Sequence, residues 1–510
     1  MLSSFLVTIT GIVADPALLG LAVGGVLLGV VLGAMPGVSS TMALAILLPV
    51  SFAMEAGPAL TFLIAVFSAS VFGGSVSAIL LNIPGTPGAI VTQLDGYPMA
   101  QSGRAGHALT YALIASTLGG LIGLIILVVV APLIASAAMS FRSPEFAMAA
   151  VFGLTMLAYA SPGSTLRGIL VGALGLLCGM VGFDTLTDAP RFTFGTAFLE
   201  SGVDIVPLTV GLFGLAEVMR NLGAPAERIA SVPKIGSLMP PLRDIARLWK
   251  AMLRGSLIGT FIGAIPAAGS AIAVAVSYAQ EMRLSKTPER FGKGEPAGIV
   301  APEASNNACV GGALVPMMTL GIPGDTMTAV LTGALLLHGL RPGPMLFAEH
   351  PEFVSIVYAS LFLAIALTLV SGFFTIRIIV RVMRAPRRML LVGIAVLCVV
   401  GSFAVRNTIT DVYVMLFFAA TGYLLYLLRL PAAPMAFGLI LGPILEENVR
   451  RSLIVSRGDW FVFVDRPISL FLLVLSVAAL AWPVAAPYLK AGVRRLRSSP
   501  ADIHSESSPP

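Results

Sequence analysis

Long stretches without a charged residue constrain this chain more than any other feature. They lie at 16–54, 56–94, 105–141, 146–166, 255–280, 304–324, 353–376 and 467–489. A helix crosses the hydrocarbon core with about 20 apolar residues, so most of these runs are long enough to span a membrane, and the first three have room for two passes each. Further spans are predicted at 168–183, 389–405, 412–428 and 430–445. Because the runs lack the alternating pattern of a membrane barrel, the sequence predicts an all-α, polytopic membrane helix bundle.

Composition excludes several other classes of protein. Only 11% of the residues are charged and 57% are hydrophobic, whereas soluble domains carry roughly 25% charged residues. The net charge of +6 comes from Lys and Arg in the short segments between apolar runs. That distribution indicates membrane topology, so we expect no nucleic-acid partner. The three cysteines and four histidines have no ligand spacing, and we therefore predict no disulfide framework, no metal site and no cofactor.

Two motifs recur in the same order in the two halves of the chain. The Gly-Ala-Met-Pro-Gly segment at 33–37, followed by a Ser/Thr cluster, is matched by Gly-Ala-Ile-Pro at 263–266, followed by Gly and Ser. A Gly-Gly pair followed by Ile-Pro-Gly occurs at 73–85 and again at 311–324. The offset between the halves is nearly the same for both motifs. Many carriers are built from two related repeats, and this order predicts such an architecture.

The distribution of basic residues predicts the orientation. Lys and Arg concentrate at 220–254, 377–388 and 490–497, which places these segments in the cytoplasm, while the acidic segment 184–204 is placed outside. Counting the spans between these segments predicts that the two halves have opposite orientations in the membrane. The N-terminus is then periplasmic and the C-terminus cytoplasmic. The predicted organisation is a first transmembrane repeat at 1–220, a basic cytoplasmic linker at 221–254, a second transmembrane repeat at 255–446, a loop and final transmembrane helix at 447–490, and a disordered cytoplasmic tail at 491–510.

Pro and Gly interrupt the spanning segments twice in each half. Pro removes a backbone donor and clashes with the preceding turn, so 36–37, 84–88, 266–269 and 323–324 predict broken or re-entrant helices. Interrupted helices at matching places in two halves indicate a substrate site. Half-helices that begin after the breaks present N–H groups and a positive dipole end, which suit a carboxylate. The predicted substrate-binding residues are Pro36, Gly37, Ser39, Ser40, Thr41, Asn82, Pro84, Gly85, Thr86, Gly269, Ser270, Asn306, Asn307, Pro323, Gly324 and Thr326.

Two acids near the breaks, together with unwound backbone carbonyls, are candidates for holding a coupling cation. Asp325 follows an apolar run, and because a charge in lipid is costly we expect it in a cavity rather than in a surface loop. Asp95 is followed by Gly96 and Pro98, so a cytoplasmic turn is the alternative for that residue. For Glu303, a helix-cap role and a role in the site stay open.

Glycines also recur about one helical turn apart in the first apolar run. Gly24, Gly25, Gly29 and Gly33 have the spacing of a helix face that packs closely on a neighbouring helix. We therefore interpret these glycines as packing residues rather than ligand contacts.

The residues around the breaks resemble a known family. The stretch Leu-Asn-Ile-Pro-Gly-Thr-Pro-Gly at 81–88, continuing to 95–100, together with Ala-Pro-Glu-Ala-Ser-Asn-Asn at 301–307 and Gly-Ile-Pro-Gly at 321–324, is similar to the large permease subunit of the tripartite tricarboxylate transporters. The resemblance implies secondary active uptake across the bacterial inner membrane, driven by a sodium or proton gradient. It also implies a small four-helix membrane subunit and a periplasmic solute-binding protein as partners. Substrates in that family include citrate, other di- and tricarboxylates, and some aromatic or amino acids.

Two other functions stay open as alternatives to the carrier. An intramembrane enzyme would use paired acids, a Ser/His pair or a zinc motif such as His-Glu-x-x-His within its spans; the sequence contains no such zinc motif, and we predict no catalytic residue. A channel can also contain inverted repeats and re-entrant loops. Saturable uptake that depends on an ion gradient would distinguish the carrier from both.

Overall fold

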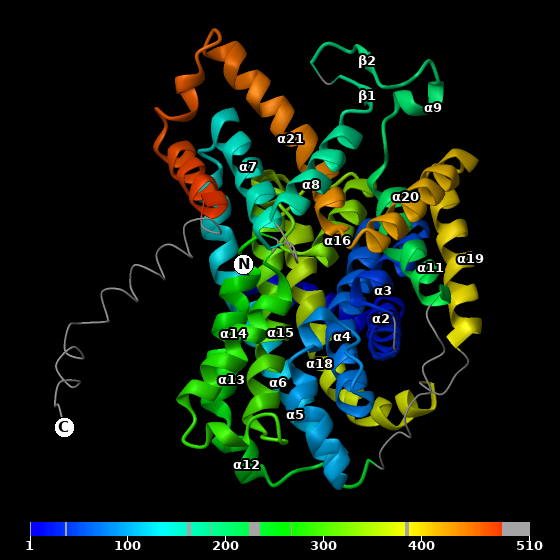
Figure 1. The fold of residues 1–510 in the computed structure, drawn as a ribbon, viewed down its shortest axis with the longest axis vertical. Helices are drawn as coiled ribbons and strands as arrows, with labels where there is room; N and C mark the ends of the chain where they lie inside the picture. Colours follow the sequence, from blue (N-terminus) through cyan, green and yellow to red (C-terminus); the bar gives the residue numbers. More distant parts are fainter. Residues whose placement is uncertain are drawn as a thin grey trace, which may run out of the picture.

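The computed structural model describes residues 2–35, 38–160, 165–184, 186–223, 235–266, 268–382 and 387–481. Nearly all of this part of the chain is helical, and its strands form one short antiparallel pair, β1 (Gly182–Phe183) with β2 (Pro190–Arg191). Six of its helical segments are long and apolar enough to cross a membrane. The predicted all-α, polytopic helix bundle is therefore confirmed (Figure 1).

The helices follow one another with few residues between them. In the first half they are α1 (Leu2–Ala14), α2 (Pro16–Ala34), α3 (Ser40–Leu47), α4 (Ala56–Leu81), α5 (Thr92–Met99), α6 (Ala105–Ala138), α7 (Ser143–Ala160), α8 (Thr165–Gly179), α9 (Ala197–Glu200), α10 (Ile205–Thr209) and α11 (Ala216–Gly223). In the second half they are α12 (Leu242–Arg247), α13 (Trp249–Gly263), α14 (Gly269–Leu284), α15 (Ala297–Leu320), α16 (Thr326–Leu337), α17 (Pro344–Glu349), α18 (Pro351–Val382), α19 (Arg387–Arg406), α20 (Ile409–Leu427) and α21 (Ala433–Val455). A further helix covers Pro467–Ala481.

The apolar run at 105–141 differs from its prediction. It was expected to have room for two passes, but it forms the single long helix α6. Gly119 and Gly123, which offered a place to turn, lie instead against the backbone of Ala304 and Ala308 in α15. The glycines are used for close packing, so the helix continues through them.

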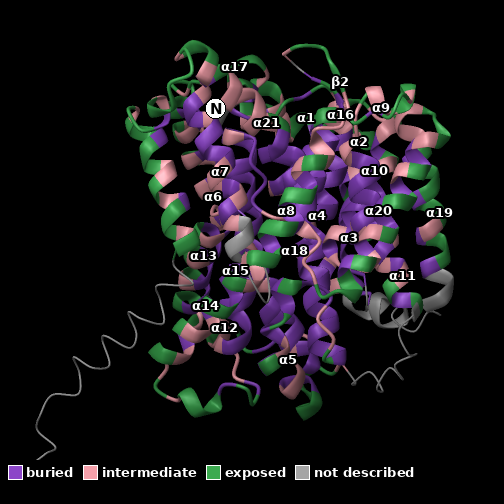
Figure 2. Cartoon of the chain, turned by 45° about the horizontal axis from the view of Figure 1, so that its top comes forward, coloured by how far each residue is buried: buried purple, intermediate pink, exposed green. Residues whose placement is uncertain are grey.

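Helices α4 and α15 form the centre of the bundle. Every residue of the membrane-spanning window of α4 is buried, and all but the ends of α15 are buried as well. Such helices are apolar all round because no face of them reaches the surroundings. Figure 2 shows this buried interior, with exposed residues confined to the outer helices and the ends of the molecule.

The two halves pack their central helices in the same way. Helix α2 lies along α4 and helix α13 lies along α15. An ideal Cβ on Gly29 would lie 2.7 Å from the Val66 carbonyl oxygen, and one on Gly263 would lie 2.7 Å from the Cys309 carbonyl oxygen. The glycines with such contacts are Gly25, Gly29 and Gly33 in α2, and Gly255, Gly259 and Gly263 in α13. The packing interpretation is thus confirmed for three of the four predicted glycines, whereas a Cβ on Gly24 would have nothing within 4 Å.

The outer helices present large apolar side chains away from the bundle. Leu166 is 73% exposed, Phe374 is 73% exposed and Phe417 is 63% exposed. Apolar surface on this scale does not suit water, whereas hydrocarbon chains accommodate it. The outer surface is therefore that of a protein embedded in lipid.

A charged network fixes the β1–β2 hairpin to the end of helix α21. Arg450 and Arg191 both pair with Asp184, and both also contact Glu446. The hydrogen bond from Arg450, supported by the backbone N–H groups of Leu186 and Thr187, holds the pKa of the Asp184 carboxyl far below its usual range. The hairpin is thus attached by charges rather than by a long ladder of strands.

Candidate functional site

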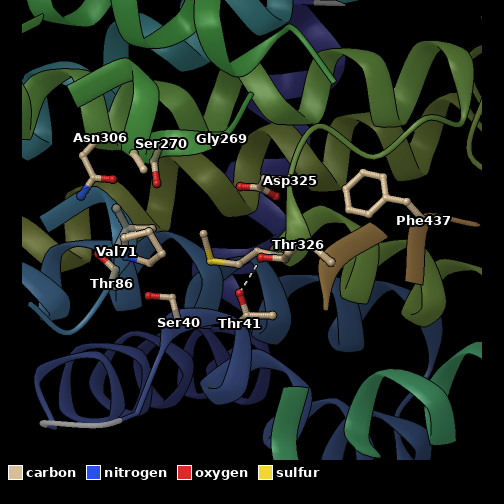
Figure 3. Close-up of a pocket in the computed structure, with 14 residues that line it drawn as sticks. Ser40, Thr41, Val71, Thr86, Gly269, Ser270, Asn306, Asp325, Thr326 and Phe437 are labelled. Atoms are coloured by element: carbon tan, nitrogen blue, oxygen red, sulfur yellow. Dashed lines mark hydrogen bonds between the residues drawn. The ribbon is translucent and has the colours of Figure 1, made fainter. Parts of the chain in front are cut away.

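A cavity of about 240 Å³ lies where the interrupted segments of the two halves meet (Figure 3). Three helices that follow breaks begin at its wall, namely α3, α14 and α16, and the turn after Thr86 contributes as well. The residues that line it are Ser40, Thr41, Val71, Thr86, Pro87, Gly269, Ser270, Ala271, Asn306, Asp325, Thr326, Met327, Ala433 and Phe437. The predicted convergence of four broken segments is therefore present in the structure.

Local capping explains why the helices begin at the cavity. The side chain of Ser39 accepts a hydrogen bond from the N–H of Met42 at 3.1 Å, which starts α3. Gly269 has a φ of +68°, a conformation that glycine adopts without strain, and α14 starts there. Asp325 starts α16 through a capping box with Thr328. The first turns of these helices leave backbone N–H groups without an intrahelical partner, and the positive dipole ends point to the same place.

Three buried polar atoms of the lining have no hydrogen-bond partner among the described residues. They are Ser40 Oγ, Thr86 Oγ1 and Asn306 Nδ2, and the three residues are at most 5% exposed. A buried donor left unsatisfied costs about 1–3 kcal/mol, so native structures rarely keep one without a reason. All three groups are able to donate to an oxygen atom. The wall is thus prepared for a ligand that brings hydrogen-bond acceptors.

The charge of the described lining is carried by a single carboxyl group. No Lys, Arg or His is among the lining residues, and Asp325 is the acid among them. Its Oδ1 accepts from the N–H and the Oγ1 of Thr328, both at 2.8 Å. The expectation that Asp325 lies in a cavity rather than in a surface loop agrees with this position.

The cavity joins the two halves directly. Thr41 Oγ1, at the start of α3, lies 2.7 Å from Thr326 Oγ1, at the start of α16 (Figure 3). This hydrogen bond connects the first break of the first half to the second break of the second half. A movement that separates these two helix starts would have to break it.

The predicted site residues divide into three groups. Seven of the sixteen predicted substrate-binding residues line the cavity, together with Asp325: they are Ser40, Thr41, Thr86, Gly269, Ser270, Asn306 and Thr326. Ser39, Asn82, Pro84, Gly85, Asn307, Pro323 and Gly324 are not among the lining residues. Pro36 and Gly37 lie outside the described residues.

Several residues that do not line the cavity shape the breaks around it. Asn82 ends α4 with a φ of 59°, and Gly321 ends α15 with a φ of 72°, so both take the left-handed conformation of a helix C-cap. An ideal Cβ on Gly85 would lie 2.8 Å from Gly74 Cα, and one on Gly324 would lie 2.6 Å from Ala313 Cα. These two glycines let each unwound segment lie directly on the central helix of its own half.

The remaining acids lie away from the cavity. Asp95 does not occupy a surface turn: it lies in α5, is fully buried, and binds the N–H groups of Gly294 and Glu295 and the hydroxyl of Tyr278. Glu303 is six residues into α15, whose N-cap is Pro296, so its helix-cap interpretation is wrong. Neither acid is among the lining residues of the cavity. In the described part of the chain, no three His, Cys, Asp or Glu residues come together as a metal site.

The sequence-based prediction missed the contribution of α21 to the wall. Ala433 and Phe437 come from the start of this helix, more than 100 residues beyond the second Ile-Pro-Gly motif. Val71, Pro87, Ala271 and Met327 were missed as well, although each is within a few residues of a motif. Apolar residues in an apolar span carry no local signal that separates a cavity wall from ordinary packing.

Comparison with known proteins finds a family model that covers most of the chain. Residues 19–437 match the tripartite tricarboxylate transporter TctA family. An uncharacterized 52.8 kDa protein in the TAR-I ttuC' 3' region of Agrobacterium vitis is 37% identical over 454 residues, which cover 89% of this chain and 90% of that protein. An uncharacterized protein in the TAR-II ttuC' 3' region of the same organism is 36% identical over 219 residues, covering 43% of this chain and 90% of that protein. No solved structure matches. This chain therefore belongs to the tripartite tricarboxylate transporter TctA family.

Proposed function

We propose that the protein is the large membrane subunit of a binding-protein-dependent carrier that imports small di- or tricarboxylates with a cation gradient. The unpartnered donors in the cavity between the two halves carry this proposal. Ser40, Thr86 and Asn306 each offer a hydrogen to an acceptor, and carboxylate oxygens are strong acceptors. The helix starts around them add partial positive charge without a buried Arg or Lys.

The carboxyl of Asp325 gives a physical reason for coupling to a cation. An anionic substrate and an anionic side chain in one cavity repel each other, and the low dielectric of a membrane protein strengthens that repulsion. A cation that accompanies the substrate, bound in the cavity or close to it, would offset this repulsion. Binding of substrate and cation would then be favoured together.

Movement of the halves would transfer the substrate across the membrane. Many carriers with interrupted helices hold the substrate near the bilayer midplane and alternate access by moving one repeat against the other. Here the bond between Thr41 and Thr326 is one of the contacts between the halves that would open and close in such a cycle. The predicted inversion of the two halves fits this scheme, with the inner membrane as the location.

Membership of the family supports the two further partners. A small four-helix membrane subunit would cover part of the apolar outer surface, and a periplasmic solute-binding protein would deliver the carboxylate. These partners set the conditions for a direct test.

The test is uptake of labelled citrate, succinate and malate by vesicles that contain the membrane subunits. Uptake is measured with and without the binding protein, and with a sodium gradient, a proton gradient or neither. We expect saturable accumulation that needs the binding protein and one of the gradients. Flux that follows the substrate gradient alone and does not saturate would favour a channel, and absence of flux for the whole panel would contradict the proposed substrate class.

A further inference from the structure

A second polar site lies inside the bundle, one helical turn from the cavity. Glu303 in α15 is 0% exposed. Ser75 Oγ of α4 lies 2.7 Å from both of its carboxyl oxygens, Thr92 Oγ1 of α5 bonds Oε1, and Ser116 Oγ of α6 bonds Oε2 at 3.2 Å. Three helices of the first half therefore hold one acid of the second half (Figure 1).

No cation neutralises this carboxyl group. Among the described residues, Glu303 forms no salt bridge, and α4 carries no charged residue. On α5 the acid is Asp95, which is bound to a loop and to Tyr278; on α6 the basic groups are Arg104 and His107 at the N-terminal end. On the other helices packed against α15 the charged groups are Lys250 and Arg254 of α13, Glu281 and Arg283 of α14, Asp325 at the N-cap of α16, and Glu349 of α17; Arg254 is paired with Glu281. An unpaired acid inside a membrane is costly, and such residues mark proton or ion pathways.

The partners of Glu303 tolerate both of its protonation states. A hydroxyl group donates and accepts, so Ser75, Thr92 and Ser116 can donate to a carboxylate or accept from a carboxylic acid after rotating. A Ser or Thr hydroxyl in a helix also finds a carbonyl of the preceding turn when it turns away. No protein group is left unsatisfied in either state.

The other two buried acids lack this property. Asp95 Oδ1 accepts from two backbone N–H groups, at 2.9 and 2.7 Å, and Asp325 Oδ1 accepts from the N–H of Thr328. A backbone N–H cannot become an acceptor, so these hydrogen bonds cannot reverse their direction as those of a hydroxyl can. Both acids serve as anchors, one for a loop and one for a helix start.

The distances around Glu303 favour a proton over a metal ion. The hydroxyl oxygens lie at direct hydrogen-bond distance from the carboxyl oxygens, so no space for a cation separates them. A proton needs no such space, because it is carried within the hydrogen bond itself.

The cluster is connected to the substrate cavity through two helices. On α4, Val71 lines the cavity and Ser75 follows one turn later; on α15, Asn306 lines the cavity three residues after Glu303. Residues three or four apart share a helix face. In addition, Asn307 donates to Ser116 Oγ at 2.8 Å and so orients that hydroxyl.

We propose that Glu303 is the binding site of the coupling proton of this carrier. The inference rests on the proposed function and identifies the coupling ion as a proton. Glu303 takes a proton from the water on the outer side, becomes a neutral carboxylic acid, and returns the proton to the water on the inner side; no electrons move. Protonation removes a negative charge one turn from the donor amide of Asn306. The protonated carrier therefore binds a carboxylate more tightly, and the carboxylate-bound carrier binds the proton more tightly.

The first experiment compares wild type with Glu303→Gln in vesicles that contain the complete transporter. Gln has the shape of the protonated acid and stays neutral. We expect exchange of labelled for unlabelled citrate across the membrane to persist within about threefold, while accumulation driven by a pH gradient falls to the level without a gradient. Glu281→Gln, which removes an acid outside the cavity and the cluster, should retain gradient-driven accumulation.

Three transport outcomes overturn the inference. They are accumulation by Glu303→Gln under a pH gradient, loss of both exchange and accumulation by a correctly inserted variant, and wild-type accumulation that needs sodium and ignores the pH gradient. Absence of wild-type transport for every carboxylate contradicts the proposed function instead, and a second measurement then decides the inference.

That measurement is infrared difference spectroscopy of the purified protein during a pH titration. Wild type should show the carbonyl band of a protonated carboxylic acid that disappears as the pH rises, and Glu303→Gln should lack this band. Ser75→Ala removes a donor to the anion, so the midpoint of the titration should move to higher pH. A Glu303 band that does not titrate, or a wild-type spectrum identical to that of the Gln variant, overturns the inference whether or not transport was seen.

Discussion

Substrate affinity should depend most directly on the side-chain amide of Asn306. Its Nδ2 has no hydrogen-bond partner in the described part of the chain, and the residue is 2% exposed in the wall of the cavity. A hydrogen bond to a charged group contributes about 1.5–3 kcal/mol. Asn306→Ala should therefore raise the KM for carboxylate uptake by about 10- to 100-fold, since 1.4 kcal/mol corresponds to a factor of ten.

The matched control for this prediction is Asn82→Gly. Asn82 also carries an amide next to a break, but it is exposed and ends α4 in a left-handed conformation that Gly adopts readily. Its KM should stay within about twofold of wild type. Equal increases of KM in the two variants would show that the amides act on the backbone of the breaks rather than on the substrate.

Single residues also show where prediction from sequence ends. Ser40 and Thr86 were identified because a polar side chain beside a break in an apolar span has few alternative uses. Asn82 and Asn307 satisfied the same rule, yet one is a helix cap and the other supports Ser116. Which way a side chain points depends on the helical register against neighbours far away in the chain, and a local motif does not contain that information.

At the scale of elements, α2 offers a direct test of its packing face. Gly29→Ala places a methyl group against the Val66 carbonyl, whereas Gly24→Ala places one in open space. Overpacking costs about 1–3 kcal/mol, so Gly29→Ala should lower the thermal unfolding midpoint in detergent. Gly24→Ala should leave the midpoint unchanged or raise it, because Ala favours a helix over Gly. Similar midpoints for the two variants would contradict the close contact of α2 with α4.

The attachment of the hairpin to α21 predicts a dependence on pH. Because Arg450 lowers the pKa of Asp184, the carboxylate stabilises the folded state fully above its unfolded pKa of about 3.9, and this contribution is lost as the pH falls toward the folded pKa. The unfolding midpoint of wild type should fall more steeply between about pH 5 and pH 3 than that of Asp184→Asn. Asp188→Asn, in the same turn, serves as the control and should keep the wild-type slope. Parallel curves for wild type and Asp184→Asn would show that the ion pairs do not hold the hairpin.

Elements whose signals are local were predictable, and elements defined by distant contacts were not. The breaks follow from Pro and Gly, whose effect on the backbone is independent of the rest of the fold. Whether the run at 105–141 makes one pass or two was left open, because the role of its glycines follows only from the backbone of α15. Similarly, α21 was not assigned to the cavity, because residues 433–437 contain no motif that indicates which distant helices they contact.

At the scale of the whole molecule, the orientation in the membrane is open to a labelling test. Helix α9 and helix α12 lie at opposite ends of the long axis in Figure 1. Phe198 in α9 is 46% exposed and Leu242 in α12 is 71% exposed, so a cysteine at either place would be accessible. In a background without Cys178, Cys309 and Cys398, an impermeant maleimide should label Phe198→Cys in spheroplasts and Leu242→Cys only after the membrane is opened. The reverse labelling pattern would contradict the predicted orientation in the membrane.

The complete burial of α4 has a consequence for how the protein is made. This helix enters the membrane early in synthesis, yet it packs against α15 and α18, which the ribosome completes much later. Until the chain has grown past Glu303, the face of α4 that carries Ser75 has lipid or an insertion factor as its neighbour. The nascent first half is therefore an incomplete bundle with polar groups in hydrocarbon, and its survival depends on the speed with which the second half follows.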